Sequence, residues 1–193
     1  MAETKLEVQE TSPWNLPNAI TAARILLVPV FIYFLFAHPD KADIGRWWAV
    51  LLFVVTISTD GLDGAIARKR GLVTNVGKIL DPIADKALIG GALVSLSILN
   101  EVYWWVTITI LVREIGITVY RFAVIRRKIV SASGGGKLKT ILQSIAVGFL
   151  LSPFDYYFGS GMFVFEQVLL YAAYVLTMYS GAQYLISASK ARG

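Results

Sequence analysis

The fold of this 193-residue chain is decided by residues 47–70, which read WWAVLLFVVTISTDGLDGAIARKR. The segment begins as an apolar run, carries Asp60 and Asp63 near its end, and closes on three basic residues. A helix of about 20 predominantly apolar residues has the length that crosses the hydrocarbon core of a bilayer. The segment therefore predicts a membrane helix that holds two acids at one end.

Apolar runs of this kind recur along the chain, over residues 20–37, 47–66, 82–99, 103–124, 140–154 and 162–187. The composition agrees, because 56% of the residues are hydrophobic and the mean hydropathy is +0.62, more than a soluble domain of this size can bury. We expect an all-α integral membrane protein with six transmembrane helices around a cytoplasm-facing polar cavity. Residues 1–17 are expected to form a cytosolic tail, and residues 18–190 a single six-helix domain.

Basic residues gather in two of the connections between these runs. They are Arg68, Lys69, Arg70 and Lys78 in the first, and Arg126, Arg127, Lys128, Lys137 and Lys139 in the second. The positive-inside rule places both connections in the cytoplasm, and an even number of spans then places both termini there. We expect a multi-pass cell-membrane protein whose active site faces the cytoplasm. Its net charge of +5 is explained by loops that face anionic lipid, without a nucleic-acid partner.

Four aspartates form the strongest candidate site. The chain has no cysteine and only one histidine, so a metal would be held by oxygen ligands. Asp60 and Asp63 are three residues apart and Asp81 and Asp85 four, separations that put each pair on one face of a helix. Crowded acids beside a bilayer need cations to balance their charge. Mg²⁺ or Mn²⁺, as two ions per subunit, would meet that need and would favour a phosphorylated ligand.

Small residues surround these acids, namely Gly61, Gly64, Ala65, Ala67, Gly71 and Gly77. They leave room for a bulky nucleotide beside the backbone. Close packing of helices is the alternative explanation for the glycines alone, since small residues are common at helix contacts in membranes.

The motif that runs from Asp60 to Asp85 resembles the signature of the CDP-alcohol phosphotransferases. The resemblance implies six-helix subunits, a homodimer and divalent metals. It also implies that Asp60, Asp63 and Asp81 are metal ligands, and that Asp85 both reaches the metal and takes the acceptor's proton. Four further residues are implied to contact CDP-diacylglycerol: Gly64, Arg68, Thr74 and Gly77. For Arg68, whose guanidinium suits a diphosphate, an ordinary solvated arginine is the alternative.

Three other segments are similar to the branch of this family whose acceptor is glycerol 3-phosphate, and they cover residues 15–24, 113–121 and 136–143. Arg113 and Arg121 are eight residues apart, about 80° around a helix, so both can face one cavity. Buried arginines in a span need an anion, and within that helix only Glu114 is available. Lys137 and Lys139 are expected to close over an acceptor phosphate, with a purely topological role as the alternative.

A polar stripe also marks the first apolar run, where Asn18, Thr21 and Arg24 are spaced three apart. We expect the stripe to line the substrate pocket, with Asn18 and Thr21 at the nucleotide and Arg24 at either phosphate. Helix capping and helix–helix hydrogen bonds are the alternative. His38, in a loop at the opposite end, is expected to be merely solvated.

The predicted function is transfer of a phosphatidyl group from CDP-diacylglycerol to glycerol 3-phosphate, which gives phosphatidylglycerophosphate and CMP in phospholipid biosynthesis. The first alternative keeps this chemistry with another acceptor, above all inositol phosphate, which is also anionic. A more distant alternative is a divalent-metal transporter that uses the same acids.

Overall fold

The computed structural model describes residues 16–70, 77–124 and 135–190, and all regular structure in these ranges is helical. The helices are α1 (Leu16–Ala37), α2 (Arg46–Arg70), α3 (Gly77–Ile98), α4 (Trp104–Val124), α5 (Gly135–Leu151), α6 (Phe154–Phe158) and α7 (Ser160–Lys190). Each of the six predicted apolar runs coincides with one long helix. The all-α prediction is therefore confirmed.

The short helix α6 was not predicted, and the expected fifth run was too long at its end. Pro153 follows α5 closely, and a proline cannot continue a helix because it lacks the N–H and its ring clashes with the preceding turn. The chain turns again at Gly159, whose φ of 75° lies in the left-handed region that favours glycine. These two residues confine α6 to a single short segment between α5 and α7.

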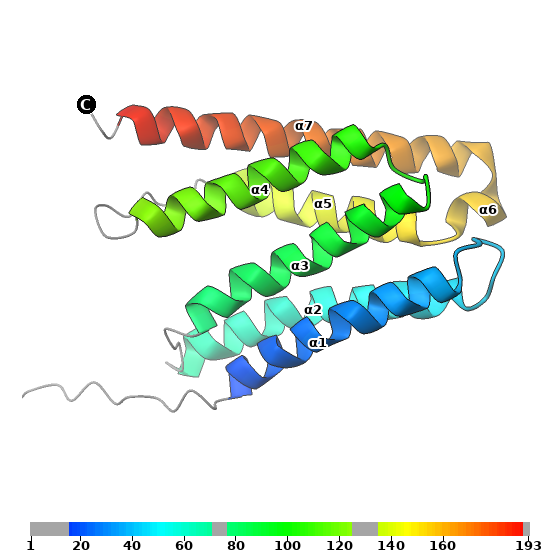
Figure 1. Ribbon diagram of the computed structural model, residues 1–193, viewed down its shortest axis with the longest axis horizontal. Helices are drawn as coiled ribbons and strands as arrows, with labels where there is room; N and C mark the ends of the chain where they lie inside the picture. The colour runs from blue at the N-terminus through cyan, green and yellow to red at the C-terminus, as the bar shows by residue number, and fades with distance from the viewer. Residues whose placement is uncertain (1–15, 71–76, 125–134, 191–193) are drawn as a thin grey trace, which may run out of the picture.

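The long helices lie side by side along one axis (Figure 1). The α1–α2 and α3–α4 connections and α6 gather at one end, which we call the loop end. At the opposite end, which we call the acid end, α2 and α4 finish, α1, α3 and α5 begin, and α7 finishes. The two basic connections, between α2 and α3 and between α4 and α5, are thus flanked by helix ends that lie at the same end of the bundle. The predicted topology requires this arrangement.

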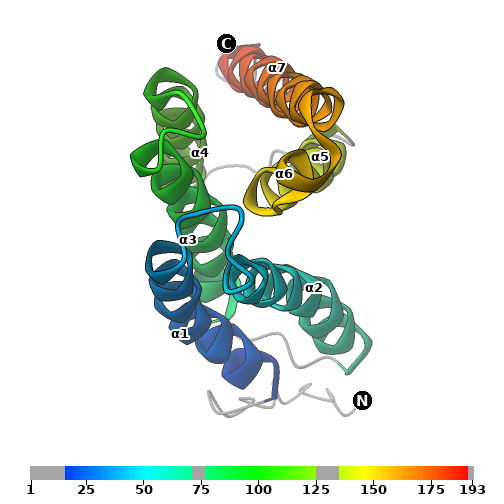
Figure 2. The same cartoon turned by 90° about the vertical axis from the view of Figure 1, so that its right-hand side faces the viewer.

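The helix contacts divide the bundle into two groups joined by α3 and α4. Helix α1 packs most extensively against α2 and α3, and α5 packs against α7 (Figure 2). Phe31 of α1 and Phe53 of α2 are fully buried, and their ring centroids lie 5.9 Å apart. A Cβ atom at Gly91 of α3 would lie 3.1 Å from Cδ1 of Ile32, so this glycine permits the close approach of α1.

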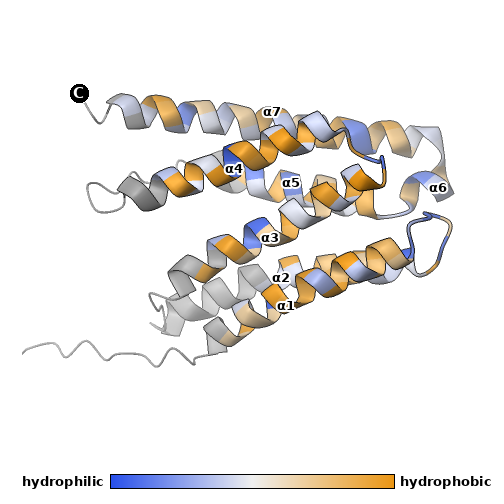
Figure 3. Ribbon diagram, in the orientation of Figure 1, coloured by the Kyte–Doolittle hydropathy of each residue, from blue (hydrophilic) through white to orange (hydrophobic). Residues whose placement is uncertain are grey.

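Hydrophobic residues recur along the long helices (Figure 3), and large apolar side chains are exposed on the outside as well as buried inside. Leu26, Tyr33 and Val112 are each more than 65% exposed, on helices α1 and α4. Soluble monomers rarely expose contiguous apolar patches of more than a few hundred Å². Ala19–Ala37 and Ser160–Ser187 are long and apolar enough to cross a membrane, and Arg46–Thr59 and Leu138–Leu151 form shorter apolar stretches. The surface is that of a protein embedded in lipid.

A buried ionic network fastens the loop end, and we call it the loop-end network. Its members are Lys41, Arg46, Glu101, Asp155 and Glu166. Nζ of Lys41 lies 2.8 Å from Asp155 and 3.7 Å from both Glu101 and Glu166. Arg46 donates to the carbonyl oxygens of Leu151 and Pro39 and to Glu101. Burial raises the pKa of Glu101, against the opposing effect of Arg46 and Lys41.

The expectation that His38 is merely solvated is wrong. Its Nδ1 lies 2.7 Å from Oδ2 of Asp43, and its ring stacks on Phe34 at 6.4 Å between centroids. Gly45 lies against the same ring, because a Cβ atom there would come within 2.2 Å of Nδ1. The histidine is a structural part of the α1–α2 connection, which the sequence could not indicate because its partners are brought together by a turn.

Candidate active site

The backbone brings the four predicted acids to the acid end of the bundle. Asp60 and Asp63 lie in the C-terminal half of α2, and Asp81 and Asp85 lie in the first turns of α3. Helices α2 and α3 contact each other, and the end of α2 and the start of α3 lie at the same end of the bundle (Figure 1). The side chain of Asp85 is partly buried, whereas those of the other three acids lie outside the part of the molecule that the structure describes.

The expected contacts to CDP-diacylglycerol fall mostly in the same place. Gly64 and Arg68 lie on α2 and Gly77 is the first residue of α3, so their backbone positions are close in the chain to the four acids. The Arg68 side chain and all of Thr74 lie outside the described residues. Their roles at the nucleotide stay predictions.

The polar stripe of α1 faces the interior, as expected. Thr21 and Arg24 are each only 1% exposed, although most of their neighbours on this helix are apolar and accessible. Because α1 packs against both α2 and α3, these two side chains point into the bundle that holds the acids. The Asn18 side chain lies outside the described part of α1.

A second polar cluster joins α4, α5 and α7, and we call it the arginine cluster: Arg113, Glu114, Lys139 and Ser180, with Gln143 one turn after Lys139 on α5. Nη1 of Arg113 donates to Oε1 of Glu114 at 2.7 Å, and Nη2 donates to Oγ of Ser180 at 2.7 Å. Nζ of Lys139 donates to the same Oε1 of Glu114. The expectation that Glu114 is the anion beside Arg113 is confirmed. The side chains of Arg121 and Lys137 lie outside the described residues.

The arginine cluster has more positive charge than its one carboxylate can balance. Lys86 of α3, directly after Asp85, also acts electrostatically on Glu114 and Lys139. Two donors, Nε of Arg113 and Nε2 of Gln143, are buried and have no hydrogen-bond acceptor among the described residues. Surplus positive charge together with unused donors is the arrangement that an incoming anion completes.

Lys86, Gln143 and Ser180 were missed as candidate site residues in the sequence. Two of them had a signal: Lys86 is a cation next to Asp85, and Gln143 follows Lys139 by four residues and so shares its helix face. Ser180 had none, because it is 67 residues from Arg113 and serine is common in membrane helices.

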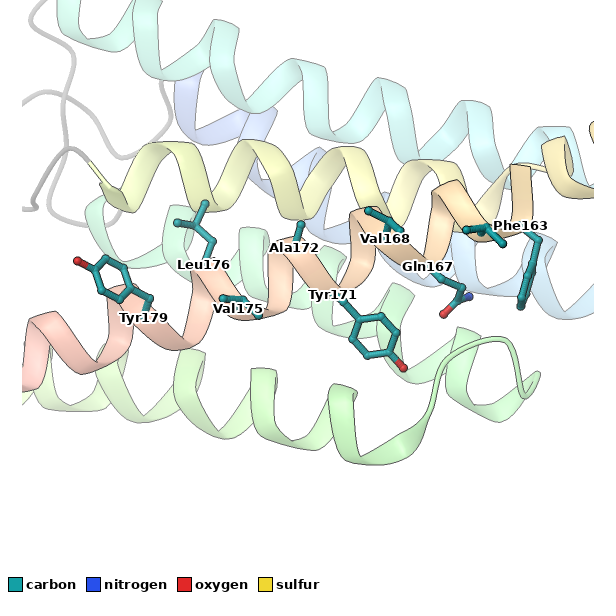
Figure 4. Close-up of a pocket in the computed structure, with 9 residues that line it drawn as sticks. Phe163, Gln167, Val168, Tyr171, Ala172, Val175, Leu176 and Tyr179 are labelled. Carbon is teal, nitrogen blue, oxygen red and sulfur yellow. The ribbon is translucent and has the colours of Figure 1, made fainter. Parts of the chain in front are cut away.

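A shallow groove runs along one face of α7, with a volume of about 1360 Å³ including its open side. Its side chains extend from Phe163 to Tyr179, and all come from α7 (Figure 4). Gln167 supplies the amide in a lining that is otherwise aliphatic or aromatic. The groove contains none of the predicted site residues and therefore suits lipid or a second subunit better than a polar substrate.

Comparison with known proteins gives the family of this chain. The family model described as CDP-alcohol phosphatidyltransferase matches residues 14–179, which include all four acids, Arg113 and Lys139. The chain is 43% identical over 177 residues to a Mycobacterium tuberculosis protein named "Probable phosphatidylglycerophosphate synthase", with 90% of this chain and 81% of that protein covered.

Two further relatives carry the name "CDP-diacylglycerol--glycerol-3-phosphate 3-phosphatidyltransferase". The Bacillus subtilis protein is 38% identical over 184 residues, which cover 89% of this chain and 93% of the relative. The Haemophilus influenzae protein is 34% identical over 178 residues, which cover 89% and 92%. With a family model that matches most of its length and relatives aligned almost end to end, this chain belongs to the CDP-alcohol phosphatidyltransferase family.

Proposed function

We propose that this chain is a phosphatidyltransferase that transfers the phosphatidyl group of CDP-diacylglycerol to glycerol 3-phosphate, with phosphatidylglycerophosphate and CMP as products. The observation that carries the choice of acceptor is the arginine cluster, in which Arg113 and Lys139 bind the carboxylate of Glu114 and Lys86 also acts on it electrostatically. A neutral alcohol would leave this surplus charge unbalanced. The names of the relatives support the same donor and acceptor.

The four acids would hold the divalent ions, Mg²⁺ or Mn²⁺, as two ions per subunit. The donor set fits, because carboxylate oxygens on two adjoining helices at one end of a bundle are the ligands that hard cations prefer. When bound, such ions neutralise the charge of the diphosphate. Six residues are proposed to bind the rest of CDP-diacylglycerol: Asn18, Thr21, Gly64, Arg68, Thr74 and Gly77.

The chemical step then needs a base, an anchor for the acceptor and a leaving group. The carboxylate of Asp85 accepts the proton of the primary hydroxyl of glycerol 3-phosphate. The hydroxyl oxygen forms a bond to the β-phosphorus, and the bond from that phosphorus to the bridging oxygen breaks, so that CMP leaves with the electron pair. The acceptor's own phosphate is held by Arg24, Arg113, Arg121, Lys137 and Lys139.

We also propose the arrangement in the membrane. All six long helices cross the bilayer, α6 lies at the outer surface, and the acid end faces the cytoplasm together with both termini. The basic connections that flank the acid end support this orientation through the positive-inside rule. The subunit is proposed to work as a homodimer in the cell membrane. The transporter alternative is set aside, because the family to which the chain belongs consists of transferases.

An acceptor panel tests the function. Purified protein is given CDP-diacylglycerol with glycerol 3-phosphate, inositol phosphate, inositol, serine or phosphatidylglycerol, and released CMP and the lipid product are measured. We expect phosphatidylglycerophosphate from the first acceptor, and no CMP in the presence of EDTA. Equal or faster CMP release with inositol phosphate would show that the acceptor is wrong.

Asp85→Asn tests the base, with Asp40→Asn in the exposed α1–α2 connection as the matched control. We expect the first change to lower kcat by about 10²- to 10⁴-fold and the second to leave kcat unchanged. Unchanged turnover by the Asp85→Asn variant would remove Asp85 from this role.

A further inference from the structure

Ser180 of α7 is bound to Arg113 in a defined direction. Its hydroxyl donates to the carbonyl oxygen of Thr177 at 3.0 Å, which uses the one hydrogen of that group. Its oxygen therefore accepts the hydrogen bond from Nη2 of Arg113 at 2.7 Å. Ser180 is only 8% exposed, so water is poorly placed to replace it. The serine fixes one edge of the guanidinium.

Gly181, the next residue, makes room for the same side chain. A Cβ atom at position 181 would lie 2.8 Å from Nε of Arg113 and 3.1 Å from its Cγ. The first separation is shorter than real Cβ contacts and the second is tighter than most, so a side chain at this position would require the Arg113 side chain to shift. The requirement is local, since a Cβ atom at Gly161 on the same helix would meet nothing within 4 Å.

The guanidinium is thus held from two helices. Glu114 takes one N–H of Nη1 and Ser180 takes one N–H of Nη2. A guanidinium has five N–H donors, so three are left, among them the buried Nε–H that has no acceptor in the described part of the chain. Fixed orientation matters here, because two parallel N–H donors bind a phosphate only when their plane faces it.

We propose that Ser180 and Gly181 are positioning residues for the acceptor: they hold the guanidinium of Arg113 in the orientation that binds the phosphate of glycerol 3-phosphate. The C-terminal helix α7 is then part of the acceptor site, although it carries none of the four acids. This inference rests on the proposed function, because it assigns Arg113 to the acceptor's phosphate. It predicts that substitution of either residue raises KM for glycerol 3-phosphate and does not change KM for CDP-diacylglycerol.

The test compares Ser180→Ala and Gly181→Ala with two control changes on the same helix, Ser187→Ala and Gly161→Ala. Ser187 is exposed and bonds only to its own helix in the described structure. We expect KM for glycerol 3-phosphate to rise by about tenfold in each test variant, as for the loss of one charge-assisted hydrogen bond. KM for CDP-diacylglycerol and kcat should change by less than about twofold in all four proteins.

A double-mutant cycle separates positioning from general packing of α7. In an Arg113→Lys background the shorter, differently shaped side chain no longer needs Ser180 or the space at Gly181. There, Ser180→Ala and Gly181→Ala should each change KM for glycerol 3-phosphate by less than about twofold. An equal loss in both backgrounds would overturn the inference, and so would an equal rise of both substrate KM values.

Failure of the inference and failure of the proposed function give different results. If the unmodified protein releases no CMP with glycerol 3-phosphate, the proposed function fails. If the unmodified protein does release CMP with glycerol 3-phosphate and the test variants match their controls, only the positioning role fails. Should Gly181→Ala not fold, Ser180→Ala still decides, because it removes a single oxygen atom.

Discussion

Arg46, fully buried at the loop end, and Arg113, partly buried in the arginine cluster, show how one residue type serves two purposes in this bundle. Every guanidinium nitrogen of Arg46 donates to a protein oxygen, from Leu151, Pro39 or Glu101. In Arg113 the Nε–H has no acceptor among the described residues. A guanidinium whose three nitrogens all donate to the protein fastens structure, and one with an unused nitrogen can still bind a ligand.

The two arginines also differ in how far neighbouring carboxylates balance their positive charge. The loop-end network has three carboxylates for two cations, so its positive charges are balanced within the protein. In the arginine cluster three cations, Arg113, Lys139 and Lys86, act on the carboxylate of Glu114. Burial of an arginine in a membrane protein therefore does not mark a binding site by itself. A binding site is indicated by unbalanced positive charge together with unused hydrogen-bond donors.

The largest effect expected from this comparison is on stability at the loop end. Arg46→Ala leaves Glu101 and two carbonyl oxygens without their donor, and breaking a buried ion pair in this way costs about 3–5 kcal/mol. Thermal or denaturant unfolding in detergent should show a loss of that order. In the folded fraction, KM for glycerol 3-phosphate should equal that of the unmodified protein. A raised KM with unchanged stability would contradict the division between the two arginines.

The next effect is on binding at the arginine cluster. Arg113→Ala should raise KM for glycerol 3-phosphate by about 30- to 150-fold, which corresponds to about 2–3 kcal/mol of charge-assisted hydrogen bonds. KM for CDP-diacylglycerol should stay within about twofold, and steady-state kinetics with each substrate varied in turn measure both. Ser187→Ala is the control. If Arg113→Ala lowers the unfolding temperature and leaves KM for glycerol 3-phosphate unchanged, Arg113 is another structural arginine.

The smallest expected effect is a pH dependence of the stability of the loop end. Hydrogen bonds from His38 and from the backbone N–H of Gly45 lower the pKa of Asp43 below its ordinary value. A lowered carboxyl pKa gives stability that is present above the ordinary pKa and is lost as the pH falls through the lowered one. The unfolding temperature of the unmodified protein should therefore approach that of Asp43→Asn between about pH 5 and pH 3. A difference that grows as the pH falls would contradict this sign.

The sequence determined the helices and the metal-binding candidates. Apolar runs surrounded by lipid or protein satisfy their backbone hydrogen bonds internally as helices, and all six runs appeared as helices at the predicted places. The spacing of Asp60, Asp63, Asp81 and Asp85 likewise follows from the period of a helix alone. Residues such as Pro153 and Gly159 moved the helix ends and created α6, a local detail that hydropathy does not resolve.

The tertiary structure decided which polar groups meet. Arg113 is bound by Ser180 from a helix 67 residues away, and Arg46 by Leu151 from 105 residues away. In the sequence, Arg113 lies inside a predicted apolar run and was assigned to the acceptor, whereas Arg46 stands just before such a run and received no role. Hydropathy and helical period describe one helix at a time, whereas the partners of a buried charge come from neighbouring helices. Only the packed bundle could therefore show that every guanidinium nitrogen of Arg46 donates to the protein, whereas Nε of Arg113 has no acceptor among the described residues.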